Sequence, residues 1–387
     1  MKKKIVILGS TGSIGTTLLD IINRNKKEYE IKLLTANKNY KTLLRQAKKF
    51  DVKNLIITNE ESYNLLKKVN TNKNIKIFNN FDCFNKIFNQ KVDYTMSSII
   101  GIDGLLPTLK IIEFTKNIAI ANKESIICGW RLIFNKLKKN KTSFIPVDSE
   151  HFSLWYGLNK INVKDVEIFY LTASGGPLYR IPISKLKNIK TSQVLKHPNW
   201  KMGKKISVDS ATMINKVFEV IEAKNIFNIS YKKIKILIHP SSYIHALIKL
   251  NNGLTKLIAH DTTMKIPIFN TLFPNFNKKI NSKKLDIRTL NNLDFNKVDS
   301  KKYPMIKILK NLPNNHSLYE TVIVSANDTL VDLFLSKKIK FNEINKKLIK
   351  IINSNEFLKL KKKTPHSIKE IIDLNNYVRL KIIKKSI

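Results

Sequence analysis

The sequence predicts an α/β protein in three parts: an N-terminal Rossmann-type, doubly wound parallel sheet, a central α+β domain and a C-terminal helical domain. Short apolar runs alternate with amphipathic stretches up to about residue 150, which is typical of a parallel sheet covered by helices. Apolar runs separated by polar loops follow in the middle of the chain. Residues 301–387 show the three- and four-residue apolar spacing of amphipathic helices.

The N-terminal part reads as strands and helices in alternation. Strands are expected at residues 4–9, 30–36, 54–58 and 117–122, and helices at 16–25, 40–50 and 61–69. Strand–helix–strand units close with right-handed crossovers, so the strands lie parallel and the helices cover both faces. We therefore expect a first domain over residues 1–150.

The middle and the end of the chain carry other patterns. In the middle of the chain we expect strands at 166–173, 234–239 and 244–250 and one helix from Ser210 to about Phe227. In the tail we expect helices at 303–312, 316–339, 341–354 and 367–385. Residues 276–300 are polar and weakly periodic, as in a linker. This places a second domain over 151–275 and a helical domain over 301–387.

A formal net charge of +41 invites the interpretation of a nucleic-acid-binding protein. The excess lysine, however, is accompanied by asparagine and isoleucine along the whole chain and forms no basic face interleaved with aromatic residues. We interpret the charge as compositional drift. It implies no nucleic-acid partner, but some attraction for phosphorylated ligands.

Two further features bear on location. No apolar run approaches the ~18–20 residues needed to span a bilayer, and no N-terminal stretch reads as a signal or transit peptide. The only cysteines, Cys83 and Cys128, lack the spacing of a metal site or a disulfide framework. We therefore expect no membrane association and a reducing, cytoplasmic location.

The first predicted strand is followed by the glycine-rich loop GSTGSIG. Gly9, Gly12 and Gly15 are spaced three apart, and a predicted helix begins behind them. Glycines allow a tight turn and the close approach of a pyrophosphate, whose charge is stabilised at the helix N-terminus. The order of strand, loop and helix predicts a dinucleotide-binding site.

The end of the second predicted strand indicates which dinucleotide binds. An NAD site usually places an acidic residue there to bind the ribose hydroxyls. This sequence has Asn37, Lys38 and Asn39 instead, which could bind a 2′-phosphate and therefore favour NADPH. The alternative is that all three are ordinary turn residues.

The segment PVDSEH at residues 146–151 places two acids at the end of another predicted strand. In extended backbone Asp148 and Glu150 would point to the same side, and Ser149 to the other. A divalent cation would remove their repulsion, and Mg²⁺ and Mn²⁺ prefer carboxylate oxygens. The alternative is a solvated strand end with two unrelated charges.

The segment LTASGGP offers a candidate anion site. Ser174 supplies a hydroxyl, and Gly175 and Gly176 supply unobstructed backbone amides. His197 follows in HPNW, where the ordinary explanation is a loop histidine.

The helix expected after Ser210 carries further polar residues. Ser210 can cap it, and Asn215 and Glu219 share one face because they are four residues apart, with Lys216 beside them. The helix could thus present a hydroxyl, an amide and an ammonium to a phosphate, and a carboxylate to a metal. Each residue also has an ordinary explanation as a cap or a solvated side chain, so the combination is what indicates a site.

Eight motifs occur in order along the chain: GSTGSIG, GLLPTL, ANKES, PVDSEH, LTASGGP, HPNW, ISVDSATMINK and IHPSSYIH. Together they resemble the 1-deoxy-D-xylulose 5-phosphate reductoisomerase family, from residue 4 to about 250 and more loosely through the tail. The resemblance implies an oxidoreductase of isoprenoid precursor synthesis that uses NADPH, requires Mg²⁺ or Mn²⁺ and is a homodimer. It also implies that residues 1–150 bind NADPH and that 151–275 form the central α+β catalytic and dimerisation domain, with the metal site and a flap. The enzyme would convert its namesake, a small phosphorylated sugar, to 2-C-methyl-D-erythritol 4-phosphate, by retro-aldol cleavage and re-addition or by a direct shift, followed by reduction.

The resemblance also implies roles for individual residues. The cofactor is expected to contact Thr11, Gly12, Ser13, Ile14, Asn37, Lys38, Asn39, Asn122, Glu124 and Gly203. The metal is expected to bind Asp148, Glu150 and Glu219, which form the catalytic group together with Lys123. The substrate is expected to contact Lys123, Ser149, Glu150, Ser174, His197, Trp200, Ser210, Asn215, Lys216 and Glu219. The loop HPNWKMGKK resembles the family's closing flap, with Trp200 as an apolar lid.

The chain departs from the family pattern in places. Asn37 stands where the family usually has glycine, although asparagine tolerates a positive φ better than most residues. The segments AHDTTMKIP (259–267) and VSANDTLV (324–331) replace more regular runs, which bears on packing and stability rather than on the chemistry. A simple NADP-dependent dehydrogenase is the competing interpretation, but it would leave three converging carboxylates without a function.

Overall fold

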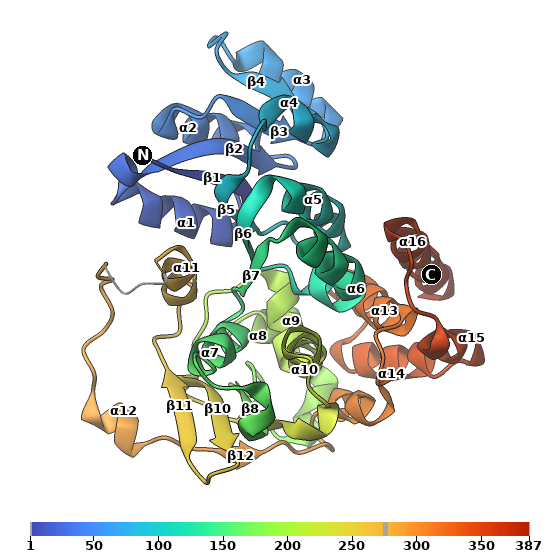
Figure 1. Ribbon diagram of the computed structural model, residues 1–387. Helices are drawn as coiled ribbons and strands as arrows, with labels where there is room; N and C mark the ends of the chain where they lie inside the picture. The colour runs from blue at the N-terminus through green and yellow to red at the C-terminus, as the bar shows by residue number, and fades with distance from the viewer. Residues whose placement is uncertain (1, 274–277, 387) are drawn as a thin grey trace. The chain divides into compact units, whose positions relative to one another are not determined.

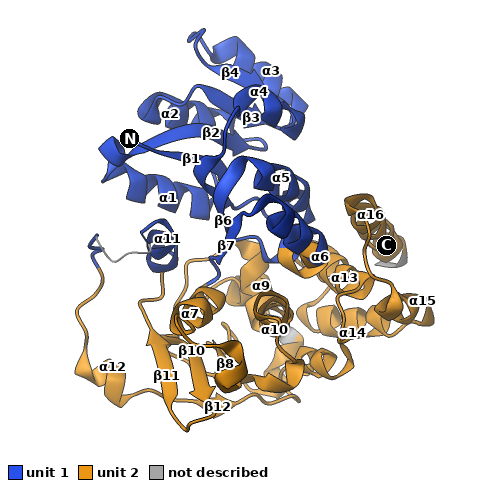
Figure 2. Ribbon diagram, in the orientation of Figure 1, with its two compact units in different colours: residues 1–125, 131–148, 264–281 blue, residues 126–130, 149–263, 282–387 orange. Residues whose placement is uncertain are grey.

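The computed structural model describes residues 2–273 and 278–386. The chain divides into two compact units (Figure 2). Unit 1 comprises residues 1–125, 131–148 and 264–281, and unit 2 comprises residues 126–130, 149–263 and 282–387. These boundaries differ from those of the three predicted domains, because 264–281 groups with the N-terminal part and the tail groups with the middle of the chain.

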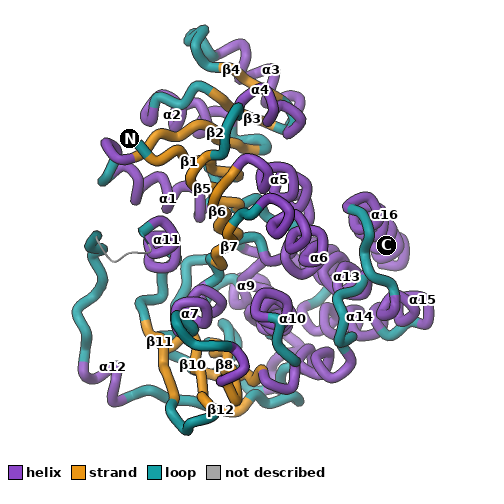
Figure 3. The backbone as a smooth tube through the Cα atoms, viewed as in Figure 1, coloured by secondary structure: helices purple, strands orange, loops and turns teal. Residues whose placement is uncertain are grey.

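Unit 1 is built on a seven-stranded sheet of order β4-β3-β2-β1-β5-β6-β7 (Figures 1 and 3). The strands span Lys3–Leu8 (β1), Tyr29–Ala36 (β2), Asn54–Ile57 (β3), Lys76–Phe78 (β4), Val92–Ser97 (β5), Thr115–Ile120 (β6) and Ser143–Pro146 (β7). All neighbouring strands are parallel. The α/β class with a parallel sheet is therefore confirmed.

Among the described residues, six α-helices lie between these strands in the sequence, with residues 126–130 of the last of them assigned to unit 2, and α11 follows the strand β11 (Thr255–Ala259) of unit 2. They span Ser13–Asn23 (α1), Tyr40–Phe50 (α2), Glu60–Val69 (α3), Phe84–Ile87 (α4), Leu105–Ile111 (α5), Lys123–Asn140 (α6) and Lys265–Leu272 (α11). In the central strand, Ile5, Val6, Ile7 and Leu8 are all completely buried. Both faces of β1 are thus covered, which is why it reads as a continuous apolar run. The glycine loop and PVDSEH both follow the carboxyl ends of strands in this sheet, where ligands bind in open α/β folds.

Unit 2 contains a five-stranded mixed sheet of order β11-β10-β8-β9-β12. The strands span Val166–Ala173 (β8), Ile234–Ile238 (β9), Ile244–Leu250 (β10), Thr255–Ala259 (β11) and Asn296–Lys297 (β12). β8 and β9 are parallel, and the other neighbours are antiparallel. Phe169 and Leu171 of β8 share a buried cluster with Val220 and Ala223 of α10 (Ile214–Phe227). This packing fixes the helix that carries Glu219.

The single helix predicted from Ser210 is two helices. α9 spans Lys204–Thr212, α10 begins at Ile214, and Met213 between them has a left-handed backbone with a φ of 65°. The prediction of one helix is therefore wrong, and Ser210 lies in the last turn of α9 instead of capping α10. A left-handed residue ends one helical hydrogen-bond ladder and lets the next helix start in a new direction.

The rest of unit 2 is mainly helical. Its other helices span Ser149–Gly157 (α7), Thr191–Val194 (α8), Ile287–Asn291 (α12), Leu318–Leu335 (α13), Phe341–Ile352 (α14), Asn355–Leu358 (α15) and Ile368–Ser386 (α16), with a 3₁₀ segment at Pro304–Asn311 (η8). The predicted linker is not irregular throughout, since it contains α12 and β12; its residues 276 and 277 lie outside the described residues. Among the helices that the structure describes, none has both the length and the apolar character to cross a membrane.

Candidate active site

The glycine loop turns sharply between β1 and α1. Gly9 has a φ of +84°, and a Cβ built on it would lie 2.9 Å from the carbonyl oxygen of Ser98. A Cβ on Gly15 would lie 2.5 Å from the carbonyl oxygen of Gly9, so both positions require glycine. Gly12 caps α1 without a side chain, which leaves the first-turn amides, beginning at Ser13, to face a ligand. Thr11, Gly12, Ser13 and Ile14 thus form a turn whose geometry suits an anion.

The three residues after β2 are exposed. Asn39 caps α2 by accepting a hydrogen bond from the Thr42 amide at 3.2 Å, and Asn37 donates to the Thr58 hydroxyl at 2.8 Å. Asn37 does not have a positive φ, so replacing the family glycine causes no backbone strain. Two of the three side chains therefore have structural hydrogen bonds, and Lys38 is the one best suited to a 2′-phosphate.

The start of α6 presents three more predicted residues. Asn122 caps the helix by accepting from the Ser125 amide at 2.8 Å, and its own amide group donates to two backbone carbonyls. Lys123 Nζ lies 3.0 Å from Asp148 Oδ2, and both side chains are mostly buried. Glu124 is buried as well. The cap fixes the helix end from which Lys123 reaches the carboxylate.

The two acids of PVDSEH do not lie on an extended strand. β7 ends at Pro146 and α7 begins at Ser149, so Glu150 stands in the first turn of a helix. The prediction that extended backbone aligns Asp148 with Glu150 is wrong, because the helix begins between them. The two carboxylates nevertheless come together with that of Glu219 on α10. Asp148, Glu150 and Glu219 each offer one oxygen atom, and these atoms lie within 4.8 Å of one another.

Lys216 supplies a positive charge to these carboxylates. Its Nζ lies 2.8 Å from Glu150 Oε1 and also pairs with Glu219. Burial disfavours the ammonium form, but the charges of Glu150 and Glu219 outweigh burial and raise the pKa of Lys216. Asn215 donates to Glu219 Oε1, and Ser149 donates to Glu150 Oε2. The predicted polar residues at the start of α10 are therefore all in one hydrogen-bonded group.

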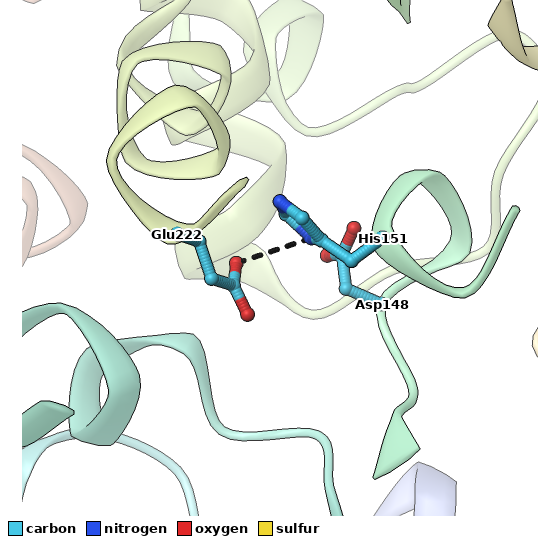
Figure 4. A group of neighbouring side chains, drawn as sticks. All are labelled: Asp148, His151 and Glu222. Atoms are coloured by element: carbon cyan, nitrogen blue, oxygen red, sulfur yellow. Dashed lines mark ion pairs between the residues drawn. The ribbon is translucent and has the colours of Figure 1, made fainter. Parts of the chain in front are cut away.

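Figure 4 shows a second group of possible metal ligands, Asp148, His151 and Glu222, which shares Asp148 with the first group. His151 Nδ1 lies 3.4 Å from Glu222 Oε2, and Nε2 donates to the backbone carbonyl of Glu219 at 2.8 Å. Both side chains are buried. His151 thereby ties α7 to the backbone of α10 at Glu219. The sequence prediction included neither residue, although Glu222 lies three positions after Glu219 and His151 stands within PVDSEH.

The double-glycine turn brings Ser174 and Ser210 into one region of unit 2. Gly175 and Gly176 have φ values of +81° and +71°, and a Cβ on Gly176 would lie 2.5 Å from the carbonyl oxygen of Ser210. Ser174 Oγ accepts from the Gly176 amide at 3.0 Å and lies 3.0 Å from His197 Nε2. Glycine is needed here for the turn and for its close approach to α9.

The tautomer of His197 follows from its contacts. Nδ1 accepts from the backbone amides of Asn199 and Trp200 at 3.2 and 3.0 Å, so the proton resides on Nε2 and is donated to Ser174. Burial lowers the pKa of His197 to about 4, so the ring is neutral at neutral pH. Ser174 therefore accepts two hydrogen bonds and keeps its own proton to donate to an anion.

The loop of Trp200 is held to the segment that follows β9. Asn199 donates to the carbonyl of Pro240 and to the hydroxyl of Ser242, at 2.5 and 3.1 Å. The Trp200 ring meets His245 edge-on, with 5.9 Å between centroids. Gly203 is exposed and has open space around it, so packing does not require a glycine there.

Three family models match the chain. The model described as 1-deoxy-D-xylulose 5-phosphate reductoisomerase matches residues 5–129, and that of its C-terminal domain matches residues 144–227. A third, described as DXP reductoisomerase C-terminal domain, matches residues 261–381. The matches thus extend through the divergent tail.

Individual proteins show the same similarity. A 1-deoxy-D-xylulose 5-phosphate reductoisomerase of Pelagibacter ubique (strain HTCC1062) is 58% identical over 387 residues, 100% of both chains. The solved structure of the Zymomonas mobilis enzyme in complex with NADPH has a TM-score of 0.88 at 31% identity and covers 100% of this chain and 99% of that one. A second solved DOX-P reductoisomerase, in complex with NADPH, fosmidomycin and magnesium, has a TM-score of 0.89 at 28% identity, covering 99% and 98%.

Proposed function

This chain belongs to the 1-deoxy-D-xylulose 5-phosphate reductoisomerase family, and from that premise we propose how its residues perform the reaction. The enzyme is an oxidoreductase that converts 1-deoxy-D-xylulose 5-phosphate to 2-C-methyl-D-erythritol 4-phosphate, with NADPH and a divalent metal ion. When bound, the metal polarises the ketone and acidifies the neighbouring hydroxyl, and NADPH supplies hydride to the rearranged aldehyde. The assignment of roles to individual residues rests mainly on one observation, the convergence of the carboxylates of Asp148, Glu150 and Glu219.

The carboxylates fit a hard divalent cation. Asp148, Glu150 and Glu219 offer oxygen atoms within 4.8 Å of one another, the ligand type that Mg²⁺ and Mn²⁺ prefer. Ser149 and Asn215 hydrogen-bond two of these carboxylates and fix their orientation. We assign the three carboxylates as ligands, and the pair His151 and Glu222 as support for the Glu219 backbone.

The glycine loop fits the cofactor pyrophosphate. Residues 11–14 form the turn into α1, and because Gly12 caps this helix without a side chain, the first-turn amides can bind the pyrophosphate. Lys38 is assigned to the 2′-phosphate, with Asn37 and Asn39 shaping the turn beside it. Asn122 positions the start of α6, from which Glu124 serves the cofactor and Lys123 the substrate. Gly203 is assigned to the cofactor through the flap loop.

The substrate phosphate is assigned to the double-glycine turn and to α10. Ser174 and Ser210 supply hydroxyls, and Asn215 and Lys216 supply an amide and an ammonium. His197 keeps Ser174 oriented as a donor through its neutral Nε2–H. Trp200 covers the site from its loop and excludes water, which would compete for the reactive aldehyde.

The assembly we propose is a homodimer in the cytoplasm. β11 is an edge strand of its sheet, and Leu254 and Leu257 beside and within it are exposed, as are Leu285 and Ile287 in the same unit. An unpaired edge with exposed apolar side chains is suited to a second copy of the chain. The cytoplasmic location is supported by the cysteine content, since Cys83 and Cys128 lack the spacing of a disulfide framework. Sedimentation of wild type and Leu257→Lys tests the dimer, which the variant should weaken.

The proposed function is tested by following NADPH oxidation after addition of 1-deoxy-D-xylulose 5-phosphate, with and without Mg²⁺, and by identifying the product. Oxidation should require both substrate and metal, and the product should carry the branched carbon skeleton. Metal-independent oxidation that gives an unbranched product would instead identify a simple dehydrogenase.

A further inference from the structure

Four aromatic rings of unit 2 form a row, which we term the aromatic row: Trp200, His245, His260 and Phe152. Trp200 meets His245 edge-on at 5.9 Å, and His245 stacks on His260 at 3.7 Å with their planes 14° apart. Phe152 meets His260 edge-on at 6.5 Å. The row runs from the Trp200 loop to α7, whose first turn carries Glu150.

Hydrogen bonds fix the tautomers of both histidines. A carbonyl oxygen only accepts, so His260 Nδ1 is protonated and donates to the carbonyl of Asp261 at 2.9 Å. His245 Nε2 likewise donates to the carbonyl of His260 at 3.2 Å. Burial lowers the pKa of His260, so its ring is neutral and Nε2 holds a lone pair.

His260 Nε2 is buried, and no described residue forms a hydrogen bond with it. A buried acceptor without a donor costs free energy, so its presence points to a donor that the protein does not supply. The charges that act on the ring are those of Glu150 and Asp261. Ionised carboxylates only accept hydrogen bonds and cannot satisfy Nε2. Phe152, which meets the His260 ring edge-on, lies on α7, and the first turn of this helix carries Glu150. The donor is therefore sought in a molecule bound beside that turn.

From these contacts we infer that His260 positions the substrate: its Nε2 accepts a hydrogen bond from a hydroxyl of the sugar phosphate, while its ring supports His245 beneath Trp200. The inference rests on the proposed function and adds to it a residue outside the eight motifs, in the segment 259–267 that departs from the family pattern. A ketose phosphate carries donors only at its hydroxyls, so Nε2 suits that part of the molecule. Ser174 and Lys216, which donate, suit the phosphate.

Two substitutions separate the lone pair from the ring. His260→Phe keeps an aromatic ring against His245 but removes the acceptor, and His260→Gln restores an acceptor on a side chain of similar length without the ring. We expect His260→Phe to raise KM for the substrate about tenfold with kcat little changed, the size and pattern of one lost binding hydrogen bond. We expect His260→Gln to recover most of that loss.

A spectroscopic measurement makes the test independent of the variants' folding. In wild type labelled with ¹⁵N-histidine, the Nε2 signal of His260 should shift upfield when 2-C-methyl-D-erythritol 4-phosphate is added with NADPH, a pair that cannot react. The signal is assigned by its absence from His260→Gln. An unmoved signal, or a KM for His260→Phe equal to that of wild type, would overturn the inference. Wild type without any activity on the sugar phosphate would instead overturn the proposed function.

Discussion

Replacing Lys216 with methionine tests whether its ammonium competes with a metal ion for the same carboxylates. Nζ lies 2.8 Å from Glu150 Oε1 and pairs with Glu219, and the residue is only 4% exposed. A metal bound ~2.1 Å from that Glu150 oxygen would lie within about 4.9 Å of Nζ, the sum of ~2.1 Å and the 2.8 Å ion pair. Methionine keeps an unbranched apolar side chain and removes the charge.

The size of the effect follows from Coulomb's law. A unit charge and a divalent ion ~4.9 Å apart repel by ~1.7 kcal/mol in the dielectric of water, and by ~7 kcal/mol at an effective dielectric constant of ~20. The lysine side chain can move away and relieve part of the repulsion, so we use the lower figure. Lys216→Met should therefore bind Mn²⁺ at least about tenfold more tightly than wild type when substrate is absent.

The assay is a Mn²⁺ titration followed by electron paramagnetic resonance, with wild type and Lys216→Met in the same buffer. Glu219→Gln is the matched control on the same turn of α10, because it removes a negative charge at similar shape. It should keep the fold, weaken Mn²⁺ binding and lower kcat, and it should reduce the rise in melting temperature that Mn²⁺ gives wild type. Unchanged or weaker Mn²⁺ binding by Lys216→Met would refute the competition.

The remaining predictions concern the cofactor, the flap and pH. The value of kcat/KM should be higher with NADPH than with NADH, because the segment after β2 contains Lys38 and no acidic residue. Equal values would contradict the assignment of Lys38 to the 2′-phosphate. Trp200→Ala should raise KM for the substrate and leave NADPH affinity, measured by fluorescence titration, nearly unchanged; the reverse pattern would exclude a flap role. Burial lowers the pKa of His197 from 6.5 to about 4, so between these values the unfolded chain binds a proton that the folded chain does not, and stability falls as pH falls through this window. Between pH 6.5 and pH 4 the melting temperature of wild type should fall further than that of His197→Gln. Equal decreases would show that the pKa of His197 is not lowered in the folded protein.

The elements that could be predicted from the sequence are those with long apolar runs. The strands expected at 166–173 and 244–250 agree with β8 and β10 to the residue. β5 was not predicted, because its sequence VDYTMS mixes polar and apolar residues although Thr95 and Ser97 are completely buried. Ser97 is accommodated by a hydrogen bond to the hydroxyl of Thr108 at 2.7 Å, a partner on another element. Pairing of this kind cannot be read from local periodicity.

In the candidate site, too, some features could be predicted from the sequence and others depend on tertiary structure. Its residue types could be predicted from the motifs, but the backbone that carries them could not. Glu150 is helical where an extended strand was expected, and the left-handed Met213 places Ser210 on a different helix from Glu219. His260 could not be found from spacing, because its significance depends on stacking with His245 from the neighbouring strand.

The start of α7 between Asp148 and Glu150 also limits how homologous chains can differ in length. Each residue added to a helix turns the following side chains by ~100°, so one residue inserted after Ser149 would carry Glu150 around to an adjacent face, away from Glu219. The exposed residues 281–286 lie outside any helix or strand, where added residues change no register. Insertions and deletions among relatives should therefore accumulate in the segment that corresponds to residues 281–286, while the spacing from Asp148 to Glu150 stays fixed.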